Sequence, residues 1–265
     1  FKQKTAYEIM PSLVGSEMCI RDRYRIKIEY DGTNFVGWQY QKNGLSVQEV
    51  IENAILSLSQ EQVTVFGAGR TDTGVHAIGQ VAHFDIVSQL SDDDFLRAIN
   101  ARLNKEIRIS KLVKVDDCFH SRFDAKSKKY EYFCCTEENP LFLKNHHFIK
   151  KIDFNLIKKA SKLIEGEHDF LSFSKFSGKE NNLCKIFNSE WLFDDKNEQK
   201  LSYIIHGNRF LHHMVRYLVG TMIAVGQNKI LIEDFLNLLN NPKKDARIFK
   251  APSKGLILRE IFYEN

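Results

Sequence analysis

Apolar and polar residues alternate strictly over residues 24–30, which is the period of a strand with one buried face. Residues 47–58 instead carry apolar side chains three or four positions apart, as an amphipathic helix does. Ser46 and Glu49 stand at the spacing of a capping box and mark the start of this helix. The pattern therefore predicts a strand followed by a helix that packs against a sheet.

The rest of the chain continues this alternation of strands and helices. Further strands are predicted at 63–66, 78–86, 107–115, 130–135, 186–193, 201–206 and 256–263. Further helices are predicted after Ser91 and at 154–165, 210–225 and 232–239. Strands joined by helices in this way are typical of an α+β protein with mixed sheets. We therefore predict two related α/β-like halves, each with a mixed, largely antiparallel sheet flanked by helices.

The same pattern divides the chain into segments. Residues 1–23 show no clear period, and we expect them to be a leader or a sequence artefact outside the fold. The two halves meet near Asp116. We therefore expect an N-terminal α/β domain at 24–116 and a C-terminal α/β domain at 117–265.

Composition places the chain among ordinary soluble proteins. Its 265 residues are 43% hydrophobic and 27% charged, and no apolar run approaches the roughly 20 residues that span a bilayer. Five cysteines without a C-x-x-C pair predict neither a disulfide framework nor a zinc knuckle. We therefore expect a cytoplasmic protein with no membrane partner.

Several classes of chemistry lack their motif. The chain contains no phosphate-binding G-x-x-x-x-G-K-[ST] and no G-x-G-x-x-G that opens a helix. The H-x-E and P-C-x-x-C pattern of zinc deaminases is absent, as is H-E-x-x-H. The sequence therefore disfavours nucleotide-triphosphate, dinucleotide and metal-dependent chemistry.

Basic residues concentrate between residues 97 and 130, where ten lysines and arginines outnumber four acidic residues. This excess is larger than the net charge of +4 of the whole chain. One interpretation is a surface that follows a phosphate backbone, with aromatic rings that stack on bases: Phe119, Phe123, Tyr130 and Tyr132. The other is a solvated face around buried aromatic side chains. Composition alone leaves both open.

Asp72 lies in a glycine-rich loop, residues 67–74, between two predicted strands. Glycines on both sides can hold its carboxylate at the tip of the loop, where it would face a cleft. The alternative is that Asp72 only caps the turn with its own side chain, as aspartates in such loops usually do. The loop by itself does not choose between the two.

Arg216 lies off the apolar stripe of the helix predicted at 210–225. It can pair with a carboxylate or a phosphate, or it can be an ordinary exposed arginine. His212 and His213 are adjacent in the same predicted helix. Their side chains are therefore expected on different faces, and the two are not predicted to form a pair of ligands.

Ordered motifs from residue 24 to the C-terminal end resemble the tRNA pseudouridine synthases of the TruA type. The most specific match is Arg70-Thr-Asp72-x-Gly-Val-His76-Ala. Further matches are Tyr30-Asp-Gly-Thr-Asn-Phe-Val-Gly-Trp38, Gly79-Gln-Val-Ala-His-Phe84, Phe119-His-Ser-Arg-Phe-Asp-Ala125, Lys129-Tyr130-x-Tyr132 and Phe210-Leu-His-His-Met-Val-Arg216-Tyr-Leu-Val-Gly220. So many matches in the family's order make coincidence a poor explanation.

The resemblance implies a pseudouridine synthase fold with a basic cleft between its two halves. It also implies that the protein isomerises uridine to pseudouridine at positions 38, 39 and 40 in the anticodon stem-loop of tRNA. No cofactor and no metal are expected. The expected partners are tRNA and a second copy of the chain in a homodimer, and no DNA partner is expected.

The same motifs imply roles for four residues. Asp72 falls on the family's catalytic carboxylate, Tyr130 on the tyrosine that stacks on the base, and Arg216 on the arginine that pairs with the carboxylate. Arg70 falls where an arginine helps to hold the extruded nucleotide. Asp72 would either attack C1′ of the ribose or remove a 2′ proton to give a glycal, and the sequence leaves both routes open.

Two other functions compete with this one. An RNA-binding module without chemistry would use the same basic surface, but a carboxylate that faces a polyanion would weaken its binding. A nucleoside glycosidase would need two catalytic carboxylates about 5–10 Å apart, and the sequence offers no second acid within a motif.

Overall fold

The computed structural model describes residues 21–175, 178, 181–193, 200–244 and 246–264. Residues 1–20 of the expected leader lie outside these described residues. Asp22 and Arg23, also assigned to the leader, instead pair with the edge of a neighbouring strand, so the first strand begins two residues earlier than predicted.

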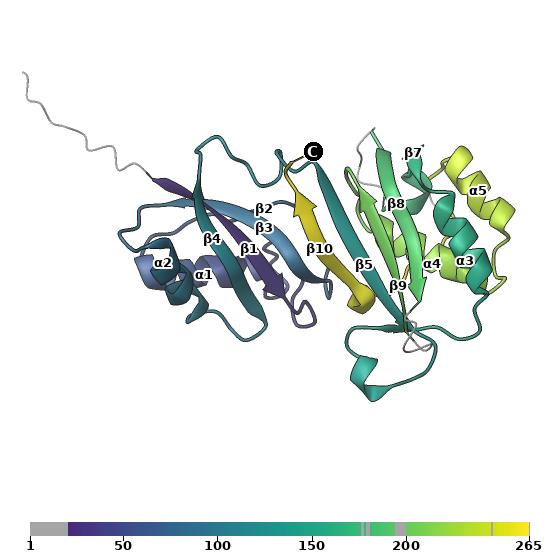
Figure 1. Ribbon diagram of the computed structural model, residues 1–265, viewed down its shortest axis with the longest axis horizontal. Helices are drawn as coiled ribbons and strands as arrows, with labels where there is room; N and C mark the ends of the chain where they lie inside the picture. The colour runs from purple at the N-terminus through teal and green to yellow at the C-terminus, as the bar shows by residue number, and fades with distance from the viewer. Residues whose placement is uncertain (1–20, 176–177, 179–180, 194–199, 245, 265) are drawn as a thin grey trace, which may run out of the picture.

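Strands and helices alternate along the described chain (Figure 1). The strands are β1 (Asp22–Tyr30), β2 (Phe66–Gly67), β3 (His76–Ile86), β4 (Ile107–Val115), β5 (Ser127–Cys135), β6 (His147–Phe148), β7 (Gly166–Asp169), β8 (Leu183–Phe193), β9 (Lys200–Gly207) and β10 (Leu256–Phe262). The α-helices are α1 (Val47–Ser59), α2 (Asp92–Asn100), α3 (Phe154–Lys162), α4 (Met214–Gly226) and α5 (Ile232–Asn240). Short 3-10 helices are η1 (Pro140–Phe142), η2 (Leu171–Phe173) and η3 (Ser253–Gly255). None of the described helices combines the length and the apolar character needed to cross a membrane.

The strands of the described residues form one sheet in the order β4-β1-β3-β10-β5-β9-β8-β7, with β2 beside β3 and β6 beside β5. Neighbours along this order are antiparallel, except that β10 and β3 run parallel. The prediction of a mixed α+β fold with a mostly antiparallel sheet is confirmed. The separate sheet expected in each half is wrong, because β10 pairs with β3 on one side and with β5 on the other.

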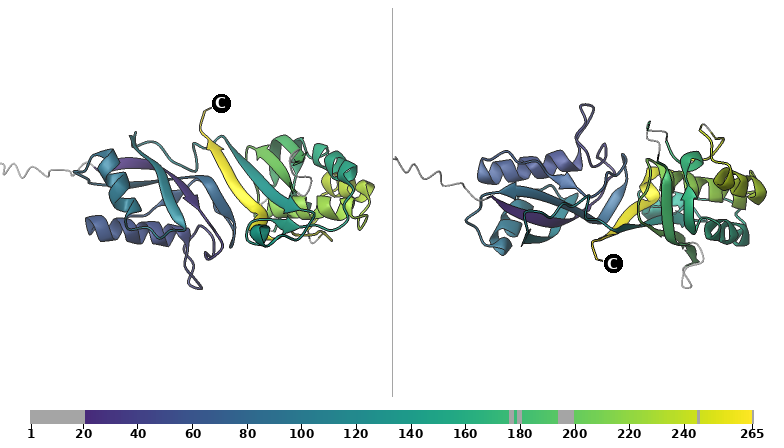
Figure 2. Two further views of the ribbon diagram at one scale, coloured as in Figure 1. Left: turned by 60° about the horizontal axis from the view of Figure 1, so that its bottom comes forward. Right: turned by 90° about the horizontal axis from the view of Figure 1, so that it is seen from above.

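β10 brings the C-terminal end of the chain to the middle of the molecule. α1 and α2 lie toward the β4 end of the sheet, and α3, α4 and α5 lie toward the β7 end (Figure 1). Figure 2 shows β10, in yellow, between these two groups of helices from two other directions. Gly79 in β3 allows this close approach, because a Cβ there would lie 2.0 Å from the carbonyl oxygen of Arg259.

Local sequence signals explain several element boundaries. The Ser46 hydroxyl accepts a hydrogen bond from the backbone N–H of Glu49, whose side chain accepts one from the backbone N–H of Ser46. The predicted capping box of α1 is therefore confirmed. α2 begins directly after Ser91, as predicted, and the Ser91 hydroxyl accepts a hydrogen bond from the backbone N–H of Asp94.

Several predicted elements have other limits in the structure. The strand predicted at 63–66 is reduced to Phe66–Gly67, since the Val65 N–H donates to the side chain of Glu52. The helix predicted at 154–165 ends at Lys162. The helix predicted from residue 210 begins only at Met214, because His213 has a left-handed φ of 62° that a right-handed helix does not contain.

Candidate active site

Asp72 lies in the loop between β2 and β3, as predicted, and the segment 35–38 holds this loop in place. The backbone N–H of Trp38 donates to the carbonyl of Thr71 at 3.2 Å. The hydroxyl of Thr73 donates to the carbonyl of Val36 at 2.9 Å. The residues on both sides of Asp72 are thus anchored, which leaves its carboxylate free to meet groups from elsewhere in the chain.

Gly37 is required at the point where this segment meets the loop. Its φ is +110°, and a Cβ there would lie 2.5 Å from the carbonyl oxygen of Thr71. Gly166 has a similar φ of +103°, but a Cβ there would meet nothing closer than 3.7 Å. Both glycines therefore have a backbone conformation that favours glycine, but only at Gly37 would a side chain also clash with the backbone.

Gly37→Ala is expected to lower the free energy of unfolding by about 2 kcal/mol more than Gly166→Ala does, because only the first forces backbone atoms apart. Urea unfolding of the two variants measures this difference. Equal destabilisation would show that the loop around Asp72 yields freely and is not fixed by segment 35–38.

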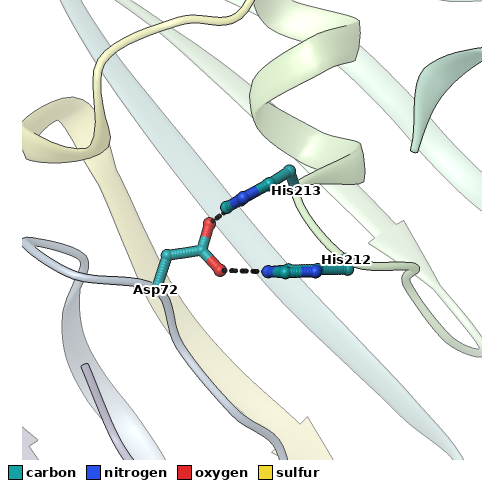
Figure 3. Close-up of side chains that lie close together, drawn as sticks. All are labelled: Asp72, His212 and His213. Carbon is teal, nitrogen blue, oxygen red and sulfur yellow. Dashed lines mark hydrogen bonds and ion pairs between the residues drawn. The ribbon is translucent and has the colours of Figure 1, made fainter. Parts of the chain in front are cut away.

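The Asp72 carboxylate meets side chains from the start of α4 (Figure 3). His213 Nδ1 donates to Asp72 Oδ2 at 2.6 Å, and Arg216 Nη1 donates to the same oxygen at 3.1 Å. Arg216 Nε also donates to the carbonyl of Ala251 at 2.9 Å. The side chain of Arg216 is only 11% exposed, so its interpretation as an ordinary exposed arginine is wrong. The contacts of the Asp72 carboxylate join the two halves of the chain instead of capping a turn.

The environment keeps the Asp72 carboxyl ionised. Burial favours its protonated form, but the hydrogen bonds and electrostatic attraction of His213 and Arg216 outweigh burial and hold the pKa of this carboxyl below its usual value. Its side chain is still 20% exposed. Asp72 is thus an anion at neutral pH that a ligand can reach.

The two histidines do not lie as predicted. Since α4 begins at Met214, they precede the helix, and their rings stack on each other at 4.0 Å between centroids. Both face Asp72, with His212 Nε2 at 3.8 Å from Oδ1 (Figure 3). The expectation that their side chains lie on different faces of a helix is therefore wrong. No local signal in the sequence marks the left-handed residue that turns them toward the aspartate.

Tyr130 lies on β5 and is 7% exposed. Its ring meets Phe210 edge to face, with centroids 5.2 Å apart. Burial first, and then the nearby Tyr30 and the charge of Asp72, raise the pKa of the Tyr130 phenol, so it stays protonated at neutral pH. The structure thus brings Tyr130 into the electrostatic neighbourhood of Asp72.

The basic residues of 97–130 take different positions. Lys128 is partly buried, and its ammonium donates to the carbonyl of Ala68 in the glycine-rich loop. Burial, followed by the charge of Arg122, lowers the pKa of Lys128 to about 8. Arg97 instead forms an exposed ion pair with Asp94 on α2. The stretch is therefore not one uniform cationic surface.

The four aromatic residues of this stretch also differ. Phe123 is 75% exposed, whereas Tyr132 is fully buried and its hydroxyl donates to the carbonyl of Pro252. The interpretation that Tyr132 stacks on a base is therefore wrong.

Arg70 lies two residues before Asp72 in the glycine-rich loop, and its side chain is exposed on the surface of that loop.

One cluster among the described residues offers enough ligand atoms for a metal ion. Asp72, His212 and His213 each supply an oxygen or nitrogen, and these atoms lie within 4.8 Å of one another. The guanidinium of Arg216, however, is 3.1 Å from the same carboxylate and would repel a cation there. The three side chains therefore fit an Asp72 carboxylate held by hydrogen bonds better than they fit a metal centre.

Comparison with known proteins agrees with the motifs. Residues 26–124 and 160–264 match the family described as tRNA pseudouridine synthase. A tRNA pseudouridine synthase A of Phytoplasma mali (strain AT) is 39% identical over 244 residues, which cover 91% of this chain and 98% of that protein. Proteins of the same name from Prochlorococcus marinus (strain MIT 9312) and Wolbachia pipientis wMel are each 39% identical, over 91% of this chain and over 91% and 100% of their own lengths. With a family match over most of its residues and relatives at this identity, the chain belongs to the tRNA pseudouridine synthase family.

Proposed function

We propose that this protein isomerises uridine to pseudouridine at positions 38, 39 and 40 in the anticodon stem-loop of tRNA, without a cofactor or a metal. The observation that carries this proposal is the partly exposed Asp72 carboxylate, anchored by Arg216 from the other half of the chain. Membership of the family supports the reaction, and the ionised state of Asp72 supports its chemistry.

The reaction needs an anion beside the ribose. The bond from C1′ to N1 breaks, the uracil turns, a bond from C5 to C1′ forms, and the proton of C5 leaves while N1 gains one. An ionised Asp72 either attacks C1′ or removes a 2′ proton to give a glycal, and both routes use the same carboxylate. The pairing guanidinium of Arg216 keeps that carboxylate anionic in a partly dry site.

The proposal gives Tyr130 and Arg70 the task of holding the nucleotide. Stacking on Tyr130 retains the detached uracil and still lets it turn, which paired hydrogen bonds would not allow. Extrusion of a stacked uridine costs a few kcal/mol, and phosphate contacts from Arg70 and the other exposed basic residues near the loop offset this cost.

The larger assembly is part of the same proposal. The segments 24–116 and 117–265 would act as two domains, with a basic cleft between them that accepts the anticodon arm. Two copies of the chain would form a homodimer, and an enzyme with tRNA as its substrate would act in the cytoplasm. The contact between Asp72 and Arg216 supports a site between the two segments, because each segment supplies one of the residues.

Chemical mapping of pseudouridine in a tRNA transcript incubated with the protein tests the proposal. We expect product at uridines 38, 39 and 40, and none in a transcript that carries cytidine at these positions. A folded protein that binds the transcript and yields no pseudouridine would favour the RNA-binding module instead.

Tyr130 provides a separate test of the stacking role. Its phenol stays protonated, so we expect Tyr130→Phe to slow the reaction by at most about 10-fold, while Tyr130→Leu, which also loses stacking, slows it by up to about 100-fold. Single-turnover rates measured at saturating protein separate the two variants. Equal losses would mean that the hydroxyl, and not the ring face, is what the reaction uses.

A further inference from the structure

The backbone of His213 has a left-handed conformation, which is uncommon among residues other than glycine. Its φ of 62° and ψ of 3° lie in the left-handed region, which residues with a side chain seldom adopt. His213 occupies the N-cap position of α4, yet its side chain makes no capping hydrogen bond to the helix. Backbone strain of this kind concentrates at functional sites.

The left-handed turn directs the imidazole toward the glycine-rich loop. His213 Nδ1 lies 2.6 Å from Asp72 Oδ2, a hydrogen bond that joins residues 141 positions apart. Arg216 Nη1 binds the same oxygen at 3.1 Å. Asp72 Oδ1 accepts no hydrogen bond among the described residues, and His212 Nε2 is 3.8 Å away from it. The two oxygens of one carboxylate thus have different surroundings.

We infer that His213 is a positioning residue which, together with Arg216, fixes Oδ2 of Asp72 and so presents Oδ1 to the ribose. This inference rests on the proposed function, because it names the oxygen that carries out the proposed reaction. Two hydrogen bonds to Oδ2 fix the rotation of the Asp72 carboxylate about its Cβ–Cγ bond. A single hydrogen bond would leave this rotation free. His213 itself does not need to touch the tRNA.

Other charged and titratable groups surround this pair. His212 stacks on the His213 ring, and the Tyr217 ring meets it edge to face at 6.1 Å. Burial first, and then the charge of His213, lower the pKa of His212. Further groups around this cluster are Arg216, also on α4, and Tyr130, Lys175 and Lys250 from other parts of the chain. Of these groups only Arg216 also donates to Oδ2, so the loss of His213 would leave that oxygen with one donor instead of two.

Two substitutions separate the donor from the backbone. Asparagine and glycine both tolerate the left-handed conformation, so neither His213→Asn nor His213→Gly adds strain. The amide nitrogen of asparagine stands as many bonds from Cα as Nδ1 does in histidine, so His213→Asn keeps a donor for Oδ2. His213→Gly removes it and leaves space for free imidazole.

We expect His213→Gly to lower kcat for pseudouridine formation by about 10- to 100-fold with KM for tRNA unchanged, since it loses one charge-assisted hydrogen bond. Added imidazole restores part of this loss, and His213→Asn stays within about 3-fold of the unchanged protein. The pKa of Asp72 rises when the donor is removed, so the acid limb of the rate profile moves to higher pH in His213→Gly.

The inference is overturned if His213→Asn is as slow as His213→Gly, or if His213→Gly reacts at the full rate. Thermal unfolding of both variants shows whether the fold is kept, and imidazole rescue distinguishes a lost donor from a damaged site. The unchanged protein is assayed in the same series. If it forms no pseudouridine the proposed function fails, whereas full activity in every variant refutes only the role of His213.

Discussion

Asp72→Asn is expected to abolish pseudouridine formation, with a loss of at least about 1,000-fold, while tRNA still binds. The amide keeps the shape of the side chain and can still meet Arg216, but it can neither attack C1′ nor accept a 2′ proton. Binding should be unchanged or slightly tighter, because one negative charge near the phosphates is removed. Chemical mapping of the product and filter binding of labelled tRNA measure the two effects.

Asp94→Asn is the matched control for this substitution. Asp94 is an exposed carboxylate on α2 that pairs with Arg97, so its replacement changes the net charge equally and leaves the site untouched. We expect normal product formation from this variant. Product from Asp72→Asn at the control's rate would refute the role given to Asp72.

Removal of Arg216 is expected to have the second largest effect. Its guanidinium spans Asp72 Oδ2 and the carbonyl of Ala251, and no other residue type reaches both with directed N–H groups. We expect Arg216→Met to slow the reaction by about 100-fold and Arg216→Lys, which keeps only the charge, by about 10-fold. Single-turnover rates at saturating protein test this order, and a lysine variant slower than the methionine variant would contradict it.

The same substitution changes the dependence on pH. The pKa of Asp72 is lower in the folded protein than in the unfolded chain. Ionised Asp72 therefore stabilises the fold at pH values above its unfolded-state pKa, and this stability is lost as the pH falls through its folded-state pKa. Burial raises the pKa of Asp72, and Arg216 counteracts this effect. The pKa of Asp72 therefore rises when Arg216 is removed. We expect Arg216→Met to lose about 2 kcal/mol of unfolding free energy at pH 7 and to move the acid limb of the rate to higher pH. Urea unfolding at several pH values checks the sign, and an acid limb that stays in place would contradict it.

Local patterns in the sequence predict those elements whose stability is local. The strict alternation at 107–115 corresponds to β4, and the Ser46 and Glu49 capping box marks the start of α1. The start of α4 could not be read in this way, because the apolar positions before Met214 continue the helical period into a turn. The left-handed residue His213 makes its hydrogen bond to Asp72, 141 positions away, and a local pattern does not contain such a contact.

Long-range pairing accounts for the other differences. β10 lies at the end of the chain, and its place between β3 and β5 depends on hydrogen bonds to strands far away in the sequence. Asp72 and Arg216 are 144 residues apart, so only the family resemblance, and not the residues around either one, pointed to their contact. His213 lies within a matched motif, but the resemblance gave it no role, and the geometry adds it to the site.

The most direct test of the Asp72 chemistry is the release of tritium from tRNA that carries [5-³H]uridine, since C5 loses its hydrogen only when it becomes bonded to C1′. With the unchanged protein in excess over tRNA, the completed reaction should release one triton for each uridine at positions 38, 39 and 40, and Asp72→Asn should release none. Release by Asp72→Asn at the normal rate, or no release by a folded protein that binds the tRNA, would contradict an isomerisation carried out by this carboxylate.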